Sequence, residues 1–180
     1  MSINDEPNKK KILVLGLEKS GKTSIVLNFI GKYNISDFFS YNNTKNPNVV
    51  KLESDNITFC LWDFNGNEAD RNEFLKNFKK YIVNTKEIFF VIDIQDLKRY
   101  DLTLTFLQEV IKKLQDLSLK VEFTFFLHKY DRDLFERFPE IKEEKIESLI
   151  RKIKQIVPPE EFHEIYKSTI YTVLDKIHIY

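Results

Sequence analysis

Apolar runs of strand length alternate along this chain with apolar residues at helical spacing. The runs cover residues 11–15, 57–63, 87–93 and 121–127, and the helical spacing covers 24–30, 68–84, 107–114 and 146–157. The last helical pattern stops at Pro158-Pro159, where a helix cannot continue. Continuous apolar runs are typical of strands buried on both faces. The alternation therefore predicts an α/β domain whose central, mostly parallel sheet carries helices on both faces.

Two further strands bring the predicted sheet to six. Asn48–Glu53 precedes Ile57–Asp63 across a Ser54-Asp55-Asn56 turn, which indicates an antiparallel hairpin, and Glu164–Lys167 is expected as the last strand. Residues 1–8 are expected to be a disordered tail, and a short helix is expected from Thr172. Residues 32–47 are rich in Asn, Ser and Tyr, and loops of that length are usually functional. We predict one domain over residues 1–180.

Composition and charge exclude several classes of function. Lys plus Arg and Asp plus Glu both number 28, so no general electrostatic attraction to nucleic acid is expected. A single cysteine excludes an internal disulfide and fits a reducing cytosol. No apolar segment has the length of a membrane span or signal peptide. We therefore expect a cytoplasmic protein without direct membrane insertion, recruited to any membrane through a partner.

The clearest motif in the chain is a phosphate-binding loop. It reads Gly16-Leu17-Glu18-Lys19-Ser20-Gly21-Lys22-Thr23, of the form G-x-x-x-x-G-K-[ST], and Ser24 opens the helix that follows. A preceding strand and a following helix are the context that this motif requires. Backbone N–H groups would cradle phosphate oxygens, while Lys22 would reach the outer phosphates and the Thr23 hydroxyl would bind Mg²⁺. The alternative is a chance glycine turn between a strand and a helix.

Other polar residues follow the predicted strands, where ligands of parallel sheets bind. Asp63 could hold Mg²⁺ and the N–H of Gly66 could meet a terminal phosphate, although D-x-x-G also occurs as a simple strand-ending turn. Asp131 could accept hydrogen bonds from the ring N–H and the amine of guanine, a donor pair that adenine lacks. This predicts guanine as the base.

The neighbours of Asp131 extend this base site. The Lys129 stem could pack over the base plane, and His128 could point toward the base, brace the phosphate loop or simply cap a strand. Backbone N–H groups of Ser168-Thr169-Ile170 could meet the guanine carbonyl.

These motifs resemble those of small Ras-like GTPases, and within that superfamily the G domain of the Rag family. His128-Lys129-Tyr130-Asp131 has the form H-K-x-D found in Rag proteins, where N-K-x-D is usual in the superfamily. Leu61-Trp62-Asp63-Phe64-Asn65-Gly66, Val91-Ile92-Asp93-Ile94-Gln95-Asp96 and Ser168-Thr169-Ile170-Tyr171 also resemble Rag segments, the last with two residues exchanged. The resemblance covers about residues 11 to 178.

The resemblance implies GTP or GDP and Mg²⁺ as ligands. The Mg²⁺ ligands would be Thr23, a first-switch hydroxyl that best matches Thr44 (with Ser40 as the alternative), and Asp63. Lys22, Gly66 and Asn67 would act in GTP hydrolysis. Protein effectors would contact the two switch segments, residues 32–47 and 64–80.

Three departures from the family patterns matter. Asn67 stands where many Ras-like enzymes have the glutamine that orients the attacking water, which predicts slow, partner-dependent hydrolysis. Glu18 stands where Ras proteins have glycine, and its side chain would obstruct an inserted arginine finger. Rag proteins carry a roadblock-type domain after the G domain, and none is expected within residues 1–180. A dimer with another GTPase or with a separate roadblock-type protein is the corresponding expectation.

Three functions are consistent with these residues. The first is a GTP/GDP switch with slow hydrolysis and a Rag-like signalling role. The second is a nucleotide-bound scaffold or heterodimer subunit with little turnover, which Asn67 and Glu18 favour. The third, a small P-loop kinase, is the weakest, because the chain has no Arg-rich lid and H-K-x-D has no role there.

Overall fold

The computed structural model describes residues 10–29, 49–54, 57–62 and 68–169. In these residues a sheet runs in the order β2-β3-β1-β4-β5-β6. Its strands are β1 (Lys10–Leu15), β2 (Val49–Ser54), β3 (Ile57–Trp62), β4 (Thr85–Asp93), β5 (Glu122–His128) and β6 (Phe162–Ser168). All neighbours are parallel except β2 and β3, which form the expected antiparallel hairpin. The prediction of a mostly parallel sheet is confirmed.

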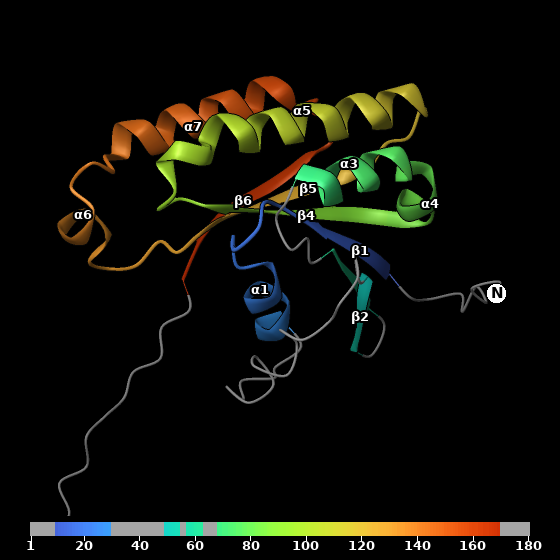
Figure 1. Ribbon diagram of the computed structural model, residues 1–180, viewed down its shortest axis with the longest axis horizontal. Coiled ribbons are helices and arrows are strands. Elements are labelled where there is room, and N and C mark those ends of the chain that lie inside the picture. The colour runs from blue at the N-terminus through green and yellow to red at the C-terminus, as the bar shows by residue number, and fades with distance from the viewer. Residues whose placement is uncertain (1–9, 30–48, 55–56, 63–67, 170–180) are drawn as a thin grey trace, which may run out of the picture.

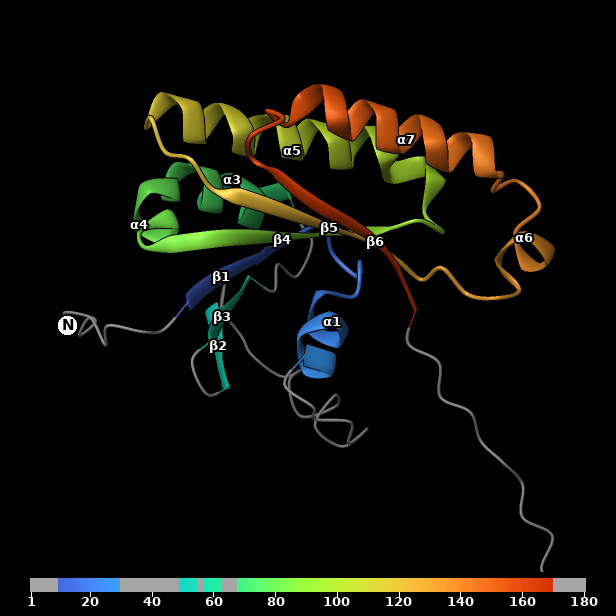
Figure 2. The same ribbon diagram turned by 180° about the vertical axis from the view of Figure 1, so that it is seen from behind.

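Helices cover both faces of this sheet. Figures 1 and 2 show α1 (Lys22–Phe29) on one face and α3 (Glu68–Lys76), α4 (Phe78–Ile82), α5 (Tyr100–Asp116) and α7 (Glu143–Ile156) on the other. The short η2 (Leu97–Arg99) precedes α5, and α6 (Leu134–Arg137) lies beyond one end of the sheet. No helix in the described part of the chain is long and apolar enough to cross a membrane.

Alternation along the strands divides the core into two apolar clusters. In β1, Ile12 and Val14 join the cluster with Ile25 and Val26 of α1, whereas Leu13 and Leu15 face the larger cluster under α3, α5 and α7. Burial on both faces explains why β1, β4 and β5 read as continuous apolar runs. Their parallel pairing places the carboxyl ends of these strands side by side.

The region predicted as one helix over 68–84 is two helices. The structure ends α3 at Lys76 and begins α4 at Phe78. The side-chain amide of Asn77 donates to the carbonyl of Glu73 at 3.1 Å, and such local side-chain bonds compete with helix continuation. Each helix still buries a phenylalanine, and Phe74 and Phe78 are in contact edge to face. The apolar spacing therefore predicted the buried face correctly and missed the break.

Several predicted segments lie outside the described residues. These are the 1–8 tail, the 32–47 loop and the helix expected from Thr172.

Candidate functional site

The phosphate loop joins β1 to α1 and is packed tightly between neighbouring strand ends. Gly16 and Gly21 have φ angles of +143° and +94°, which favour glycine. A Cβ on Gly16 would lie 2.2 Å from the carbonyl oxygen of Val91 in β4. A Cβ on Gly21 would lie 2.1 Å from Cδ2 of His128, which ends β5. Two glycines of the motif are therefore required by φ and by space.

The lysine and hydroxyl residues of the motif lie where the loop enters α1. Lys22 is only 3% exposed, and its ammonium donates to the Leu17 carbonyl at 2.8 Å, so it lies across the loop. Thr23 and Ser24 are half-buried in the first turn of α1. Lys19, with φ +57°, is exposed and makes a 3.6 Å ion pair with Glu18 that adds little stability at such exposure. Backbone N–H groups at a helix start favour anions, so the loop suits phosphate.

The loop after β5 is the predicted base site, and β4 and β6 hold it in place. His128 is 4% exposed, and its Nδ1 lies 3.1 Å from Oγ of Ser168 in β6. Burial, followed by the nearby Lys129 ammonium, lowers the pKa of His128. The Lys129 ammonium pairs with Asp93, at the end of β4, at 2.5 Å. Among the roles considered for His128, contact with the phosphate loop is the one this geometry supports.

Asp131 is held by two hydrogen-bond donors from other segments. The Thr169 hydroxyl donates to its Oδ1 at 2.5 Å, and the Gln95 side-chain amide donates to its Oδ2 at 2.9 Å. Arg137 approaches Oδ2 only to 3.8 Å and is 56% exposed. A carboxylate fixed in this way can accept two parallel N–H donors from a planar ring, as the guanine edge would supply.

The segment after β4 contributes more to this site than the sequence indicated. Gln95 bonds Asp131 and also donates to the Lys129 carbonyl at 2.9 Å. The sequence indicates this segment only through its resemblance to a Rag segment and predicts no role for Asp93 or Gln95. The signal that could have found them is their place at the end of a buried strand and just beyond it.

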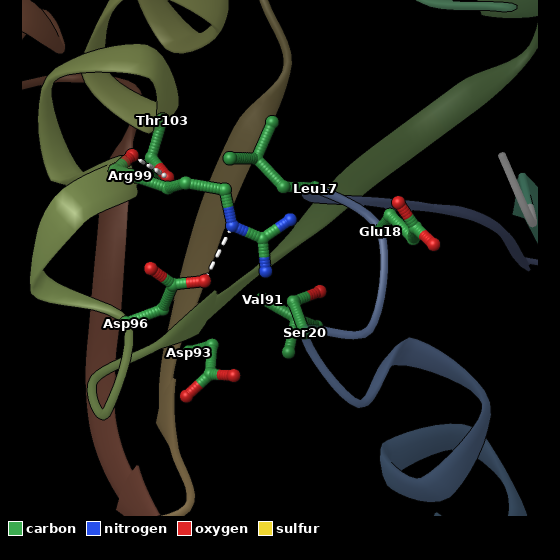
Figure 3. Close-up of a pocket in the computed structure, with 8 residues that line it drawn as sticks. All are labelled: Leu17, Glu18, Ser20, Val91, Asp93, Asp96, Arg99 and Thr103. Atoms are coloured by element: carbon green, nitrogen blue, oxygen red, sulfur yellow. Dashed lines mark hydrogen bonds and ion pairs between the residues drawn. The ribbon is translucent and has the colours of Figure 1, made fainter. Parts of the chain in front are cut away.

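A small pocket lies behind the phosphate loop, between it and the start of α5 (Figure 3). It is lined by Leu17, Glu18, Ser20, Val91, Asp93, Asp96, Arg99 and Thr103. Arg99 pairs with Asp96 at 2.5 Å and reaches toward the loop. The Ser20 hydroxyl is buried without a hydrogen-bond partner, which is uncommon. Arg99 and the phosphate loop thus line the same pocket.

The structure thus brings together the described members of the predicted site at the carboxyl ends of β1, β5 and β6. Thr44, Asp63, Gly66, Asn67 and Ile170 lie outside the described residues. Of the expected Mg²⁺ ligands only Thr23 is described, and its place in the first turn of α1, directly after Lys22, fits a hydroxyl ligand beside bound phosphate. The described residues hold no cluster of three or more acidic, His or Cys side chains that could bind a metal alone.

The fold matches solved structures of small GTPases. The Arl6 small GTPase from Trypanosoma brucei, solved with the nucleotide analogue GppNp, superposes with a TM-score of 0.57 at 23% identity, over 89% of this chain and 87% of that one. An ADP-ribosylation factor-like GTP-binding protein (SAR1) from Encephalitozoon cuniculi, in complex with GDP, gives a TM-score of 0.55 at 19% identity, over 92% and 71%. At such identities the likeness shows the fold.

The family follows from the sequence. The profile of the ADP-ribosylation factor family matches residues 2–176, so the chain belongs to this family of Ras-like small GTPases. It is 35% identical to ADP-ribosylation factor-like protein 5 from Caenorhabditis elegans over 91 residues, which is 51% of this chain and 47% of that protein. It is 28% identical to the human ADP-ribosylation factor-like protein 5A over 93 residues, or 52% and 48%. The matched stretch spans about half the length of these curated relatives.

The superfamily prediction is confirmed, and the Rag assignment within it is corrected. The family match covers residues 2–176, whereas the Rag resemblance was based on four short segments, of which H-K-x-D at 128–131 is one. That motif differs from N-K-x-D at the single position of His128, and one position discriminates poorly between families. Neither a Rag-like signalling role nor a roadblock-type partner has support apart from that resemblance.

Proposed function

We propose that this chain is a guanine-nucleotide-binding switch formed by a single G domain. The observation that supports this most is the geometry of Asp131, whose carboxylate is fixed by Gln95 and Thr169. Its loop is joined to the phosphate loop through the contact between His128 and Gly21. Because the base-binding loop and the phosphate loop are in direct contact, one nucleotide can occupy both.

Each part of the phosphate loop then has a role. Backbone N–H groups from Gly16 to Ser24 would bind the phosphate oxygens, and the Lys22 ammonium, which here donates to the Leu17 carbonyl, would bind the outer phosphates. Thr23, Thr44 and Asp63 would hold Mg²⁺, with Ser40 as the alternative to Thr44. The ion would neutralise charge on the β- and γ-phosphates.

The two switch segments respond to the γ-phosphate. Thr44 and Gly66 would contact this phosphate in the GTP state, protein effectors would then recognise residues 32–47 and 64–80, and hydrolysis would remove these contacts. Lys22, Gly66 and Asn67 act in hydrolysis, which we expect to be slow because Asn67 is one methylene shorter than glutamine. The protein acts in the cytoplasm, and any recruitment to a membrane goes through a partner.

The same Asn67 favours a second function, a nucleotide-bound scaffold or heterodimer subunit that hydrolyses GTP poorly. Glu18, beside the phosphates, also favours it, since its side chain would obstruct an arginine supplied by an activator.

Loading with Mg²⁺ and GTP, followed by timed analysis of the retained nucleotide, separates these functions. Conversion of GTP to GDP on the protein supports the switch, and GTP held unchanged supports the scaffold. A protein that retains neither nucleotide contradicts both.

A further inference from the structure

We propose that Gln95 is a positioning residue that gives the base site its selectivity for guanine, an inference that rests on the proposed function. Gln95 follows β4, whereas Asp131 follows β5, so the two residues meet only because these strands are neighbours. The Gln95 side chain orients the Asp131 carboxylate instead of contacting the base.

Gln95 is itself fixed in place by hydrogen bonds other than the one to Asp131. Its backbone N–H donates to Oδ1 of Asp93 at 3.0 Å, and the side chain is half-buried. Its side-chain amide nitrogen carries two N–H donors, which go to the Lys129 carbonyl and to Oδ2 of Asp131, each at 2.9 Å. Both donors are therefore used within the base site.

The hydrogen-bond capacity of Asp131 explains why this matters. An ionised carboxylate offers about four lone-pair sites on its two oxygens. Gln95 occupies one site on Oδ2 and Thr169 one on Oδ1. One site then remains on each oxygen, and the guanine edge presents two donors, the ring N–H and the exocyclic amine. The two internal donors thus orient the free sites as a pair.

The bond to Lys129 fixes the backbone from which Asp131 projects. Lys129 has φ +64°, a left-handed conformation that costs energy in a residue other than glycine. Residues 93–95, at the end of β4 and directly after it, make three contacts with this loop: the Gln95 amide bonds the Lys129 carbonyl, the Asp93 carboxylate bonds the Lys129 ammonium, and the Ile94 N–H bonds the His128 carbonyl. This segment therefore sets the conformation of the base loop, with Gln95 as its only side chain on Asp131 itself.

Gln95→Glu is the sharpest test, because it keeps the shape of the side chain and replaces the amide donor with a carboxylate oxygen. Two acceptors that now receive a bond from Gln95 would face a negative charge instead. Gln95→Ala removes the donor without adding charge. Gln115→Ala, at an exposed glutamine of α5, is the matched control.

The measurement is the dissociation constant of each variant for GDP and for IDP, with Mg²⁺ present. IDP lacks the exocyclic amine and so makes one of the two bonds to Asp131. We expect Gln95→Ala to lower the affinity for GDP roughly tenfold or more, and Gln95→Glu to lower it further. The affinity for IDP should fall less in both variants. The preference for GDP over IDP therefore falls, while Gln115→Ala leaves it unchanged.

Two results would overturn the inference alone: unchanged GDP affinity in both Gln95 variants, or equal losses for GDP and IDP, which would mean that Gln95 only supports the loop. If the unaltered protein binds no GDP, the proposed function fails and this inference fails with it.

Discussion

The imidazole of His128 lies against the backbone of Gly21, so closely that a Cβ on Gly21 would come within 2.1 Å of Cδ2. This contact joins the end of β5 to the last turn of the phosphate loop. The ring is in turn within hydrogen-bond distance of Ser168 in β6. The relative position of the base loop and the phosphate loop therefore depends on one aromatic side chain and one residue without a side chain.

Gly21→Ala should damage both stability and nucleotide retention. The methyl group would meet His128, and φ +94° is strained for alanine, so we expect a loss of about 1–3 kcal/mol in unfolding free energy. Urea unfolding and the amount of GDP retained after gel filtration measure the two effects. The double variant with His128→Ala should recover part of the loss, because it removes the clash and leaves the φ strain. An alanine tolerated at position 21 without any loss contradicts the close contact.

The lowered pKa of His128 should make stability fall in mild acid. The unfolded chain protonates His128 near pH 6.5 and the folded chain only at lower pH. Between these values the unfolded state binds the extra proton, so stability is complete above about pH 6.5 and declines as pH falls toward the folded pKa. The slope from this one group is at most about 1.4 kcal/mol per pH unit.

Urea unfolding at pH 7.5 and 5.5 measures this effect. We expect His128→Asn to lose less stability on acidification than the unaltered protein, and His163→Asn, at an exposed position of β6, to behave like the unaltered protein. The prediction fails if the pH dependence of His128→Asn matches that of the control.

A buried polar pair away from the nucleotide site should matter for stability alone. The Thr124 hydroxyl donates to the Glu87 carboxylate at 2.5 Å between β5 and β4, and both residues are at least nine-tenths buried. Thr124→Val removes this donor from a buried carboxylate at nearly constant shape, at a cost of about 1–3 kcal/mol. Thr105→Val, on the exposed face of α5, should cost far less. Equal unfolding free energies for the two variants would show that the buried hydrogen bond contributes no more to stability than the exposed one.

A glutamine in place of Asn67 should accelerate GTP hydrolysis. Asn67→Gln gives the side chain the reach found in many Ras-like enzymes, and a displacement of about 1 Å in a catalytic group can change rates by up to 100-fold. We expect single-turnover hydrolysis to become roughly tenfold faster in Asn67→Gln. A fast rate in the unaltered protein that persists in Asn67→Ala would instead show that position 67 does not limit the reaction.

The sequence predicted the fold well where burial is strong. The run predicted at 121–127 became Glu122–His128 and the one at 87–93 became Thr85–Asp93, because strands buried on both faces have an unambiguous apolar pattern. The sequence failed at Asn77, because the break between α3 and α4 leaves the apolar spacing intact. It also did not predict the short α6, whose four residues are too few for a period.

The sequence likewise predicted some residues of the site and missed others. The phosphate loop and Asp131 were predictable, because their residue types occur in a contiguous motif. Gln95 was not, because its role arises from the pairing of β4 with β5, which places it beside a residue 36 positions away. Ser168 and Thr169 were expected to contribute backbone N–H groups, and the structure shows that their hydroxyls meet His128 and Asp131.

The most direct test of the guanine site is the nucleotide preference of the unaltered protein and of Asp131→Asn. Calorimetry with GDP, ADP and XDP should show that the unaltered protein binds GDP and neither of the others tightly. In Asp131→Asn the affinity for GDP should drop and that for XDP should rise, because an amide presents a donor to the xanthine oxygen where the carboxylate offered only acceptors. A variant that keeps the original preference for GDP over XDP would contradict the assignment of Asp131 and the account built on it.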